Sequence, residues 1–116
     1  MTITDKSSPM ERPDRDIRGV TILGSTGSIG INALDVLARH PGKYRVVALT
    51  ANTQVDRLFE QCRHFLPRQA VMLVPRAAGQ LTEKFRAAGL DIEVLSGVDG
   101  LNAVATHPQA HTVVAA

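Results

Sequence analysis

The sequence has very few aromatic residues and only one cysteine. It contains no tryptophan, one tyrosine and three phenylalanines in 116 residues, so aliphatic side chains must fill the core. The single Cys62 excludes an internal disulfide, and we expect it to be a small buried core residue in a protein of the reducing cytoplasm. No run approaches the roughly eighteen apolar residues that a membrane span requires, so no membrane partner is expected.

An excess of charge of one sign is also lacking. Thirteen Lys and Arg face eleven Asp and Glu, a net charge of +2, and the basic residues are spread along the chain. This distribution is typical of a solvated surface and predicts no nucleic-acid partner. The histidines and acids show no compact ligand spacing either, so we predict neither a metal site nor a catalytic residue in this chain.

The first sixteen residues lack the features of a targeting segment. Residues 1–16 are polar, contain Pro9 and Pro13 and mix acids with bases, without the apolar centre of a signal peptide. We therefore predict a disordered leader at residues 1–16, followed by one small domain at residues 17–116.

Strand-like and helix-like segments alternate from residue 17 onward. We expect strands at residues 20–23, 44–50 and 70–74 and helices at residues 28–39, 55–65 and 76–88. Residues 93–95 are a fourth strand or only a connection, and residues 101–105 form a helical turn or two. Residues 112–116 are strand-like, with no helix after them to cover an exposed edge. The pattern predicts an α/β fold, a Rossmann-like doubly wound parallel sheet that is incomplete at its carboxyl end.

Three glycines follow the first expected strand in the pattern G-x-x-G-x-x-G. Gly24 is suited to the tight turn, Gly27 to close approach of the backbone to a pyrophosphate, and Gly30 to close packing of helix on sheet. In a doubly wound sheet this turn faces the cofactor crevice, and the following helix start offers free N–H groups. The pattern predicts a dinucleotide-binding turn, and the absence of the P-loop lysine excludes a nucleoside-triphosphatase loop.

Hydroxyl groups surround these glycines. We expect the hydroxyls of Ser25, Thr26 and Ser28 to be available as donors to phosphate oxygens. The alternative is an ordinary turn in which Ser28 is the helix N-cap.

The segment after the second expected strand carries no acid. Enzymes that select NAD normally present Asp or Glu there to the ribose 2′-hydroxyl, whereas this chain has Asn52, Thr53 and Gln54. These side chains suit the 2′-phosphate of NADPH as hydrogen-bond donors. Arg57 is either a counter-charge for that phosphate or a solvated helix residue.

The segments VTILGSTGSIG, LDVLARHP, YRVVALTAN, FEQCRHFLPRQAVM and EVLSG resemble, in order and spacing, the amino-terminal segment of 1-deoxy-D-xylulose 5-phosphate reductoisomerase. The resemblance covers residues 20–116. It implies an NADPH-dependent enzyme that makes 2-C-methyl-D-erythritol 4-phosphate from a sugar phosphate in non-mevalonate isoprenoid biosynthesis, with Mg or Mn as a second cofactor. It also implies a homodimer when full length.

The resemblance further implies which residues contact the cofactor. They are Thr26, Gly27, Ser28 and Ile29 in the turn and Asn52, Thr53 and Gln54 in the second loop, with Gly24 and Gly30 shaping the turn. Many members have a basic residue at the place of Thr53 and a glycine at that of Asn52. The family's metal ligands and its catalytic and carboxy-terminal domains lie outside this chain, which we therefore expect to be inactive alone.

Two other functions stay open at this point. One is another NADP-dependent reductase with a similar glycine turn, acting on a semialdehyde or an acyl phosphate. The other is a non-catalytic nucleotide-binding module, or a truncated product that folds poorly.

Overall fold

The computed structural model describes residues 1–6 and 17–116, and strands alternate with helices through the second range. The strands are β1 (Thr2–Asp5), β2 (Arg18–Leu23), β3 (Tyr44–Ala51), β4 (Gln69–Met72), β5 (Glu93–Ser96) and β6 (Thr112–Ala115). The helices are α1 (Ser28–Ala38), α2 (Val55–Phe65), α3 (Pro75–Ala88) and α4 (Gly97–Ala105).

The six strands form one sheet in the order β1-β6-β2-β3-β4-β5. β2 through β6 pair in parallel, and only β1 is antiparallel, to β6. Numbered along the chain, the parallel strands lie in the order 4-3-2-1-5, so the sheet grows outward from β2 and then reverses to β6, as in a doubly wound sheet. The predicted Rossmann-like α/β fold is confirmed, and the reversal point lies between β2 and β6.

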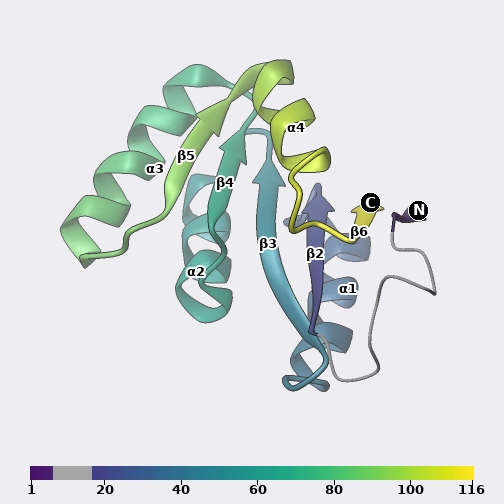
Figure 1. Ribbon diagram of the computed structural model, residues 1–116. Coiled ribbons are helices and arrows are strands. Elements are labelled where there is room, and N and C mark those ends of the chain that lie inside the picture. The colour runs from purple at the N-terminus through teal and green to yellow at the C-terminus, as the bar shows by residue number, and fades with distance from the viewer. Residues whose placement is uncertain (7–16) are drawn as a thin grey trace.

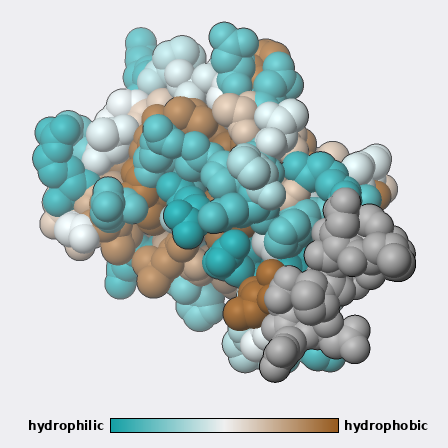
Figure 2. Space-filling model, in the orientation of Figure 1, coloured by the Kyte–Doolittle hydropathy of each residue, from teal (hydrophilic) through white to brown (hydrophobic). Residues whose placement is uncertain are grey.

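The helices cover the two faces of the sheet unequally. α1, α2 and α3 pack on one face with most of the buried core, and α4 packs on the other with a small cluster around Val104. Figure 1 shows α4 in front of the sheet and α1 and α2 behind it. The connections through α1, α2 and α3 all move away from β2, whereas α4 returns toward β6, so right-handed crossovers place α4 on the opposite face. On the α4 side, Figure 2 shows polar side chains over the middle of the molecule and hydrophobic ones gathered toward α3 and β5.

Local sequence signals account for the helix boundaries. α3 begins with Pro75, whose missing N–H costs nothing at a first helical position, and Gly89 ends it with a left-handed φ of 70°. α2 ends at Phe65 with Leu66 as its C-cap, which is left-handed with φ 50°, and Pro67 follows immediately. None of the helices in the described residues is long and apolar enough to cross a membrane.

Two weakly patterned segments are more regular than we expected. Residues 93–95, which we left open as a strand or a connection, belong to β5 and pair with β4. The helical turn expected at residues 101–105 is the end of a nine-residue helix, α4. Two glycines in its first half lower the helix propensity, so the sequence does not predict the full length of this helix. Gly100 is there because a Cβ would lie 3.0 Å from both Leu95 and Val71, so α4 packs closely on the sheet.

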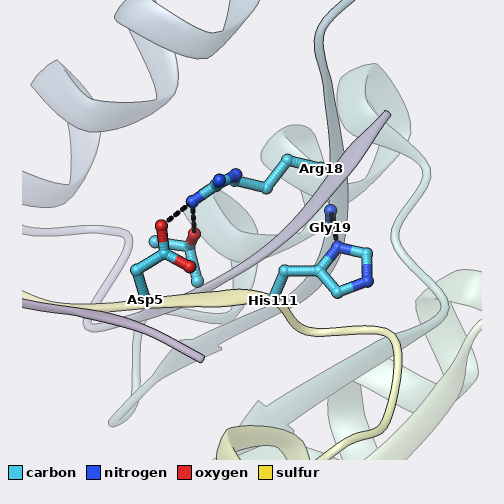
Figure 3. A network of polar contacts seen from close by, with 5 residues as sticks. Asp5, Arg18, Gly19 and His111 are labelled. Carbon is cyan, nitrogen blue, oxygen red and sulfur yellow. Dashed lines mark hydrogen bonds and ion pairs between the residues drawn. The ribbon is translucent and has the colours of Figure 1, made fainter. Parts of the chain in front are cut away.

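The amino-terminal residues differ from the expectation of a disordered leader. Thr2–Asp5 form β1 along the outer side of β6, while the rest of the expected leader, residues 7–16, lies outside the described residues. β6 is therefore paired on both sides, and the exposed terminal edge that we expected there is wrong. Arg18 on β2 contacts Asp5 on β1 and the Thr112 hydroxyl on β6, so one side chain links three strands (Figure 3).

Candidate functional site

The glycine turn lies at the carboxyl end of β2. Gly24 has a φ of 80°, which favours glycine, and its N–H donates to the Thr50 Oγ1 at 2.9 Å. Thr50 is on the neighbouring strand β3 and is 2% exposed. The expected tight turn is confirmed, and it is fastened to the adjacent strand.

Gly30 lies where α1 packs onto this turn. A Cβ at Gly30 would lie 2.3 Å from the Gly24 carbonyl oxygen and 2.6 Å from the Ser25 Cα. Both are backbone atoms, so a side chain cannot be accommodated by rotamer changes. Gly30 does permit close packing as expected, against the turn itself.

Gly27 has no comparable packing reason to be glycine. A Cβ there would meet only the Gly24 carbonyl oxygen, at 3.9 Å, and Gly27 is exposed with an ordinary φ of −79°. The protein leaves this space free beside the turn. It is the place where the backbone of a dinucleotide-binding turn approaches a pyrophosphate.

Gly27 is also the N-cap of α1, so the alternative with Ser28 as the cap is wrong: Ser28 is the first helical residue. Within the described residues α1 has no side-chain cap hydrogen bond and no acid in its first turn. The N–H groups at the helix start therefore have no side-chain acceptor there, and such groups together with the positive end of a helix dipole attract anions.

The side chains of the turn point in two directions. Gly27, Ser28 and Ile29 are exposed and Thr26 is half-buried, so the predicted contact residues lie on one accessible surface. Ser25 is fully buried, and its hydroxyl donates to the Gln61 Oε1 at 2.7 Å. The expectation that the Ser25 hydroxyl is free for a phosphate is wrong, because the protein itself engages it.

The second predicted loop follows β3 at the same edge of the sheet. Asn52, Thr53 and Gln54 are exposed, and their backbone carbonyls accept hydrogen bonds from Val74, Val55 and Leu58. The Ser25 N–H donates to the Thr50 carbonyl at 2.9 Å, which joins the glycine turn to the strand that leads into this loop. The fold therefore brings the two loops, about 25 residues apart in sequence, to neighbouring positions.

The charges beside the second loop are arranged asymmetrically. Asp56, the first acid after the loop, lies 3.0 Å from the Lys84 Nζ on α3. Arg57 is exposed and lines an open hollow of about 480 Å³ between α1 and α2, together with Ile31, Asp56, Glu60 and Gln61. A cation therefore stands next to a loop without acids, as recognition of a 2′-phosphate would require.

Sequence reasoning missed Thr50 and Gln61, which both hold the glycine turn. Thr50 follows an apolar run and gave no sign of its hydroxyl's role. Gln61 adjoins the buried stripe of Leu58 and Cys62 on α2, so a polar residue beside an apolar stripe was the available signal. Its partner is 36 residues away, beyond any local pattern.

Within the described residues, neither Cys62 nor a cluster of metal-ligating side chains offers a second site. Cys62 is fully buried, as expected, and burial raises the pKa of its thiol to about 12. Among residues 1–6 and 17–116 there is no group of three or more His, Cys, Asp or Glu side chains that could hold a metal ion.

The sequence model of the 1-deoxy-D-xylulose 5-phosphate reductoisomerase family matches residues 20–116. The chain belongs to this family. This assignment decides against semialdehyde and acyl-phosphate reductases, which share only the glycine turn. Reductoisomerases of Nitrosomonas europaea and Methylococcus capsulatus are 58% identical over 99 residues and 56% identical over 101 residues, spans that cover 85% and 86% of this chain. Those spans make up 24% and 26% of the two relatives, so the chain spans about a quarter of their length.

Solved structures of the family have the same fold. A crystal structure of DOX-P reductoisomerase with NADPH, fosmidomycin and magnesium superimposes with a TM-score of 0.78 at 37% identity, over 81% of this chain and 23% of that one. The Zymomonas mobilis enzyme in complex with NADPH gives a TM-score of 0.75 at 36% identity, over 81% of this chain and 24% of that one. At such identities the likeness extends beyond the fold to the family.

Proposed function

We propose that this chain is the NADPH-binding segment of a 1-deoxy-D-xylulose 5-phosphate reductoisomerase. The observation that carries the proposal is the contrast within the glycine turn. Backbone atoms occupy the position of a Cβ at Gly30, whereas the position of a Cβ at Gly27 is free. Two of the similar solved structures contain NADPH, which supports the same ligand here.

In this proposal the two loops divide the cofactor between them. The backbone at Thr26, Gly27, Ser28 and Ile29 holds the diphosphate, with Gly24 and Gly30 shaping the turn. Asn52, Thr53 and Gln54 donate hydrogen bonds to the 2′-phosphate, and Arg57 balances its charge. When bound, NADPH supplies the hydride that reduces a carbonyl group of the substrate; this chain's residues bind and orient it.

We assign no metal ligand and no catalytic residue to this chain. The structures similar to it include one in complex with magnesium, but the described residues contain no cluster suited to such an ion. The family reaction, conversion of the sugar phosphate to 2-C-methyl-D-erythritol 4-phosphate with Mg or Mn, is proposed for the longer protein. For this 116-residue polypeptide we expect binding without turnover.

Titration of the polypeptide with NADPH and with NADH tests the cofactor assignment. Asn52→Asp is the informative variant, because an acid at the end of β3 repels a 2′-phosphate and suits a 2′-hydroxyl. We expect it to weaken NADPH binding about tenfold, or about 1.4 kcal/mol, and NADH binding little. Asn102→Asp, the same change at another exposed position, on α4, is the matched control. Equal binding of both nucleotides by the parent chain and by Asn52→Asp would contradict the assignment.

An assay for sugar-phosphate-dependent NADPH oxidation, with Mg or Mn present, tests the expectation that this polypeptide does not turn over substrate. We expect no activity from this polypeptide, and measurable turnover would show that catalytic residues have been overlooked. A homodimer and a cytoplasmic location of the longer protein are further proposals from the family resemblance. Solution mass of that protein would test the first, and microscopy of a tagged copy the second.

A further inference from the structure

Gln61 on α2 makes a two-point contact with Ser25 in the glycine turn. The Gln61 Nε2 donates to the Ser25 carbonyl oxygen at 2.9 Å, and the Ser25 hydroxyl donates to the Gln61 Oε1 at 2.7 Å. Both distances are those of well-formed hydrogen bonds. One amide side chain therefore fixes both the backbone and the side chain of a residue 36 positions earlier.

The backbone contact has a consequence for the next residue. The Ser25 carbonyl and the Thr26 N–H belong to the same peptide unit, which is planar and trans, so the two groups point in opposite directions. Because Gln61 holds the Ser25 carbonyl toward α2, the Thr26 N–H is directed away from α2. Thr26 is the first of the residues on the accessible side of the turn.

The other hydrogen bonds of the turn do not fix the orientation of the Ser25–Thr26 peptide unit. The Ser25 N–H donates to the Thr50 carbonyl, and the Gly24 N–H donates to the Thr50 Oγ1. These two bonds fix the peptide units that precede Ser25. The Gln61 Nε2 is the side-chain donor to the carbonyl of the unit that follows.

We propose that Gln61 is a positioning residue that holds the Ser25–Thr26 peptide unit so that the Thr26 N–H donates to a phosphate of the bound dinucleotide. The inference rests on the proposed function, because it concerns the same nucleotide. Gln61 itself does not touch the ligand in this proposal. Its effect is to keep one donor oriented before binding, which avoids the cost of ordering it on binding.

Two single variants separate the backbone contact from the hydroxyl contact. Gln61→Met keeps the length of the side chain and removes both hydrogen bonds. Ser25→Ala removes the hydroxyl and leaves the bond from the Gln61 Nε2 to the carbonyl intact. Gln80→Met, on an exposed position of α3, makes the same chemical change away from the turn.

The measurement is NADPH titration of the whole 116-residue chain, followed by the backbone amide NMR signals. In the parent chain we expect NADPH to shift the amides of Thr26, Gly27 and Ser28. In Gln61→Met we expect affinity to fall about tenfold and the Thr26 response to disappear at saturation, while Gly27 and Ser28 still respond. Ser25→Ala and Gln80→Met should keep the Thr26 response.

A merely structural Gln61 would give a different result. It would lower the melting temperature and leave the pattern of amide shifts unchanged in the folded protein bound to NADPH, and that outcome would overturn the proposal. If Gln61→Met does not fold, Gln61→Glu replaces it, because the carboxylate still accepts from the Ser25 hydroxyl but cannot donate to the carbonyl. A retained Thr26 response in folded Gln61→Glu would equally overturn it. Failure of the parent chain to bind NADPH at all would instead refute the proposed function.

Discussion

Glycines lie at or just beyond both ends of strand β2, but their surroundings differ. At the amino end, Gly19 donates its N–H to the His111 Nδ1 at 3.0 Å (Figure 3), and a Cβ there would lie 1.9 Å from the Gln109 carbonyl oxygen. At the carboxyl end, Gly27 has free space beside it and starts a helix without a side-chain cap. Protein atoms occupy the position of a side chain at Gly19 but not at Gly27.

The difference separates a glycine explained by packing from one for which we propose a ligand. A glycine whose missing side chain is replaced by protein atoms is explained by packing alone. A glycine with free space and nearby helix N–H groups is not explained by the protein itself. The turn after β2 contains both kinds, since Gly30 resembles Gly19 in this respect and Gly27 does not.

The largest effect on stability should come from Gly19→Ala. The new Cβ would overlap a backbone oxygen that cannot move without displacing the loop before β6, so we expect a loss of about 3 kcal/mol or more in the free energy of unfolding. Urea denaturation measures it. Gly79→Ala is the matched control, because nothing lies within 4 Å of a Cβ at this exposed helix position. It should stabilise the protein by up to about 1 kcal/mol. Equal effects of the two variants would contradict the packing argument.

Thr50→Val tests the hydrogen bond that holds the glycine turn at the carboxyl end of β2. The change keeps the shape of a buried side chain but leaves the Gly24 N–H without its acceptor, so we expect a loss of about 1–3 kcal/mol. Thr82→Val is the control, because the Thr82 hydroxyl only contacts the Ala78 carbonyl within the same helix. It should change stability by less than about 0.5 kcal/mol. If both variants unfold at the same urea concentration, Thr50 does not hold the turn.

Cys62 gives a pH-dependent test of the core beside Gln61. Burial raises the pKa of the folded thiol from 9.0 to about 12, so the unfolded state releases this proton first as the pH rises. Stability should therefore be independent of this group below pH 9 and fall between pH 9 and 12, by about 1 kcal/mol at pH 10. Denaturation of the parent and of Cys62→Ala at several pH values isolates the thiol. Parallel curves for the two proteins would mean that the thiol does not contribute.

Gly27→Ser should have the smallest effect on stability. Serine is favoured at a helix N-cap and the backbone there has an ordinary φ, so the free energy of unfolding should change by less than about 0.5 kcal/mol. The side chain would nevertheless occupy the free space beside the turn. We expect NADPH affinity to fall about tenfold or more, or about 1.4 kcal/mol. Unchanged affinity in a well-folded Gly27→Ser would show that no ligand approaches this backbone.

Much of the fold was predictable because its signals are local. Helix α3 is bounded by Pro75 and Gly89, and the buried strand β3 reads as an apolar run, so each is visible in a short window of sequence. α4 was partly missed because it contains two glycines, which lower helix propensity: Gly97 has a left-handed φ of 70°, and Gly100 packs against β4 and β5. β1 was missed because its four residues are all exposed and carry no apolar pattern.

The site was predictable to a lesser extent. The positions of the glycines identified the turn, the tight φ at Gly24 and the close packing at Gly30, and the role of Gly27 toward a ligand stays a prediction. They did not show that the Ser25 side chain turns inward, because that depends on Gln61 and Thr50, which belong to other elements.

The sequence by itself determined the alternation of strands and helices, the glycine turn after the first parallel strand and the family. Only the tertiary structure decided which glycines are enclosed by protein, which hydroxyl is buried and how β6 is covered. The physical reason is the range of the interactions. Helix and strand periodicity reflects neighbours a few residues apart. Apart from the packing of Gly30 on the turn, these contacts join residues 25 to more than 90 positions apart, which meet only once the strands are ordered in the sheet.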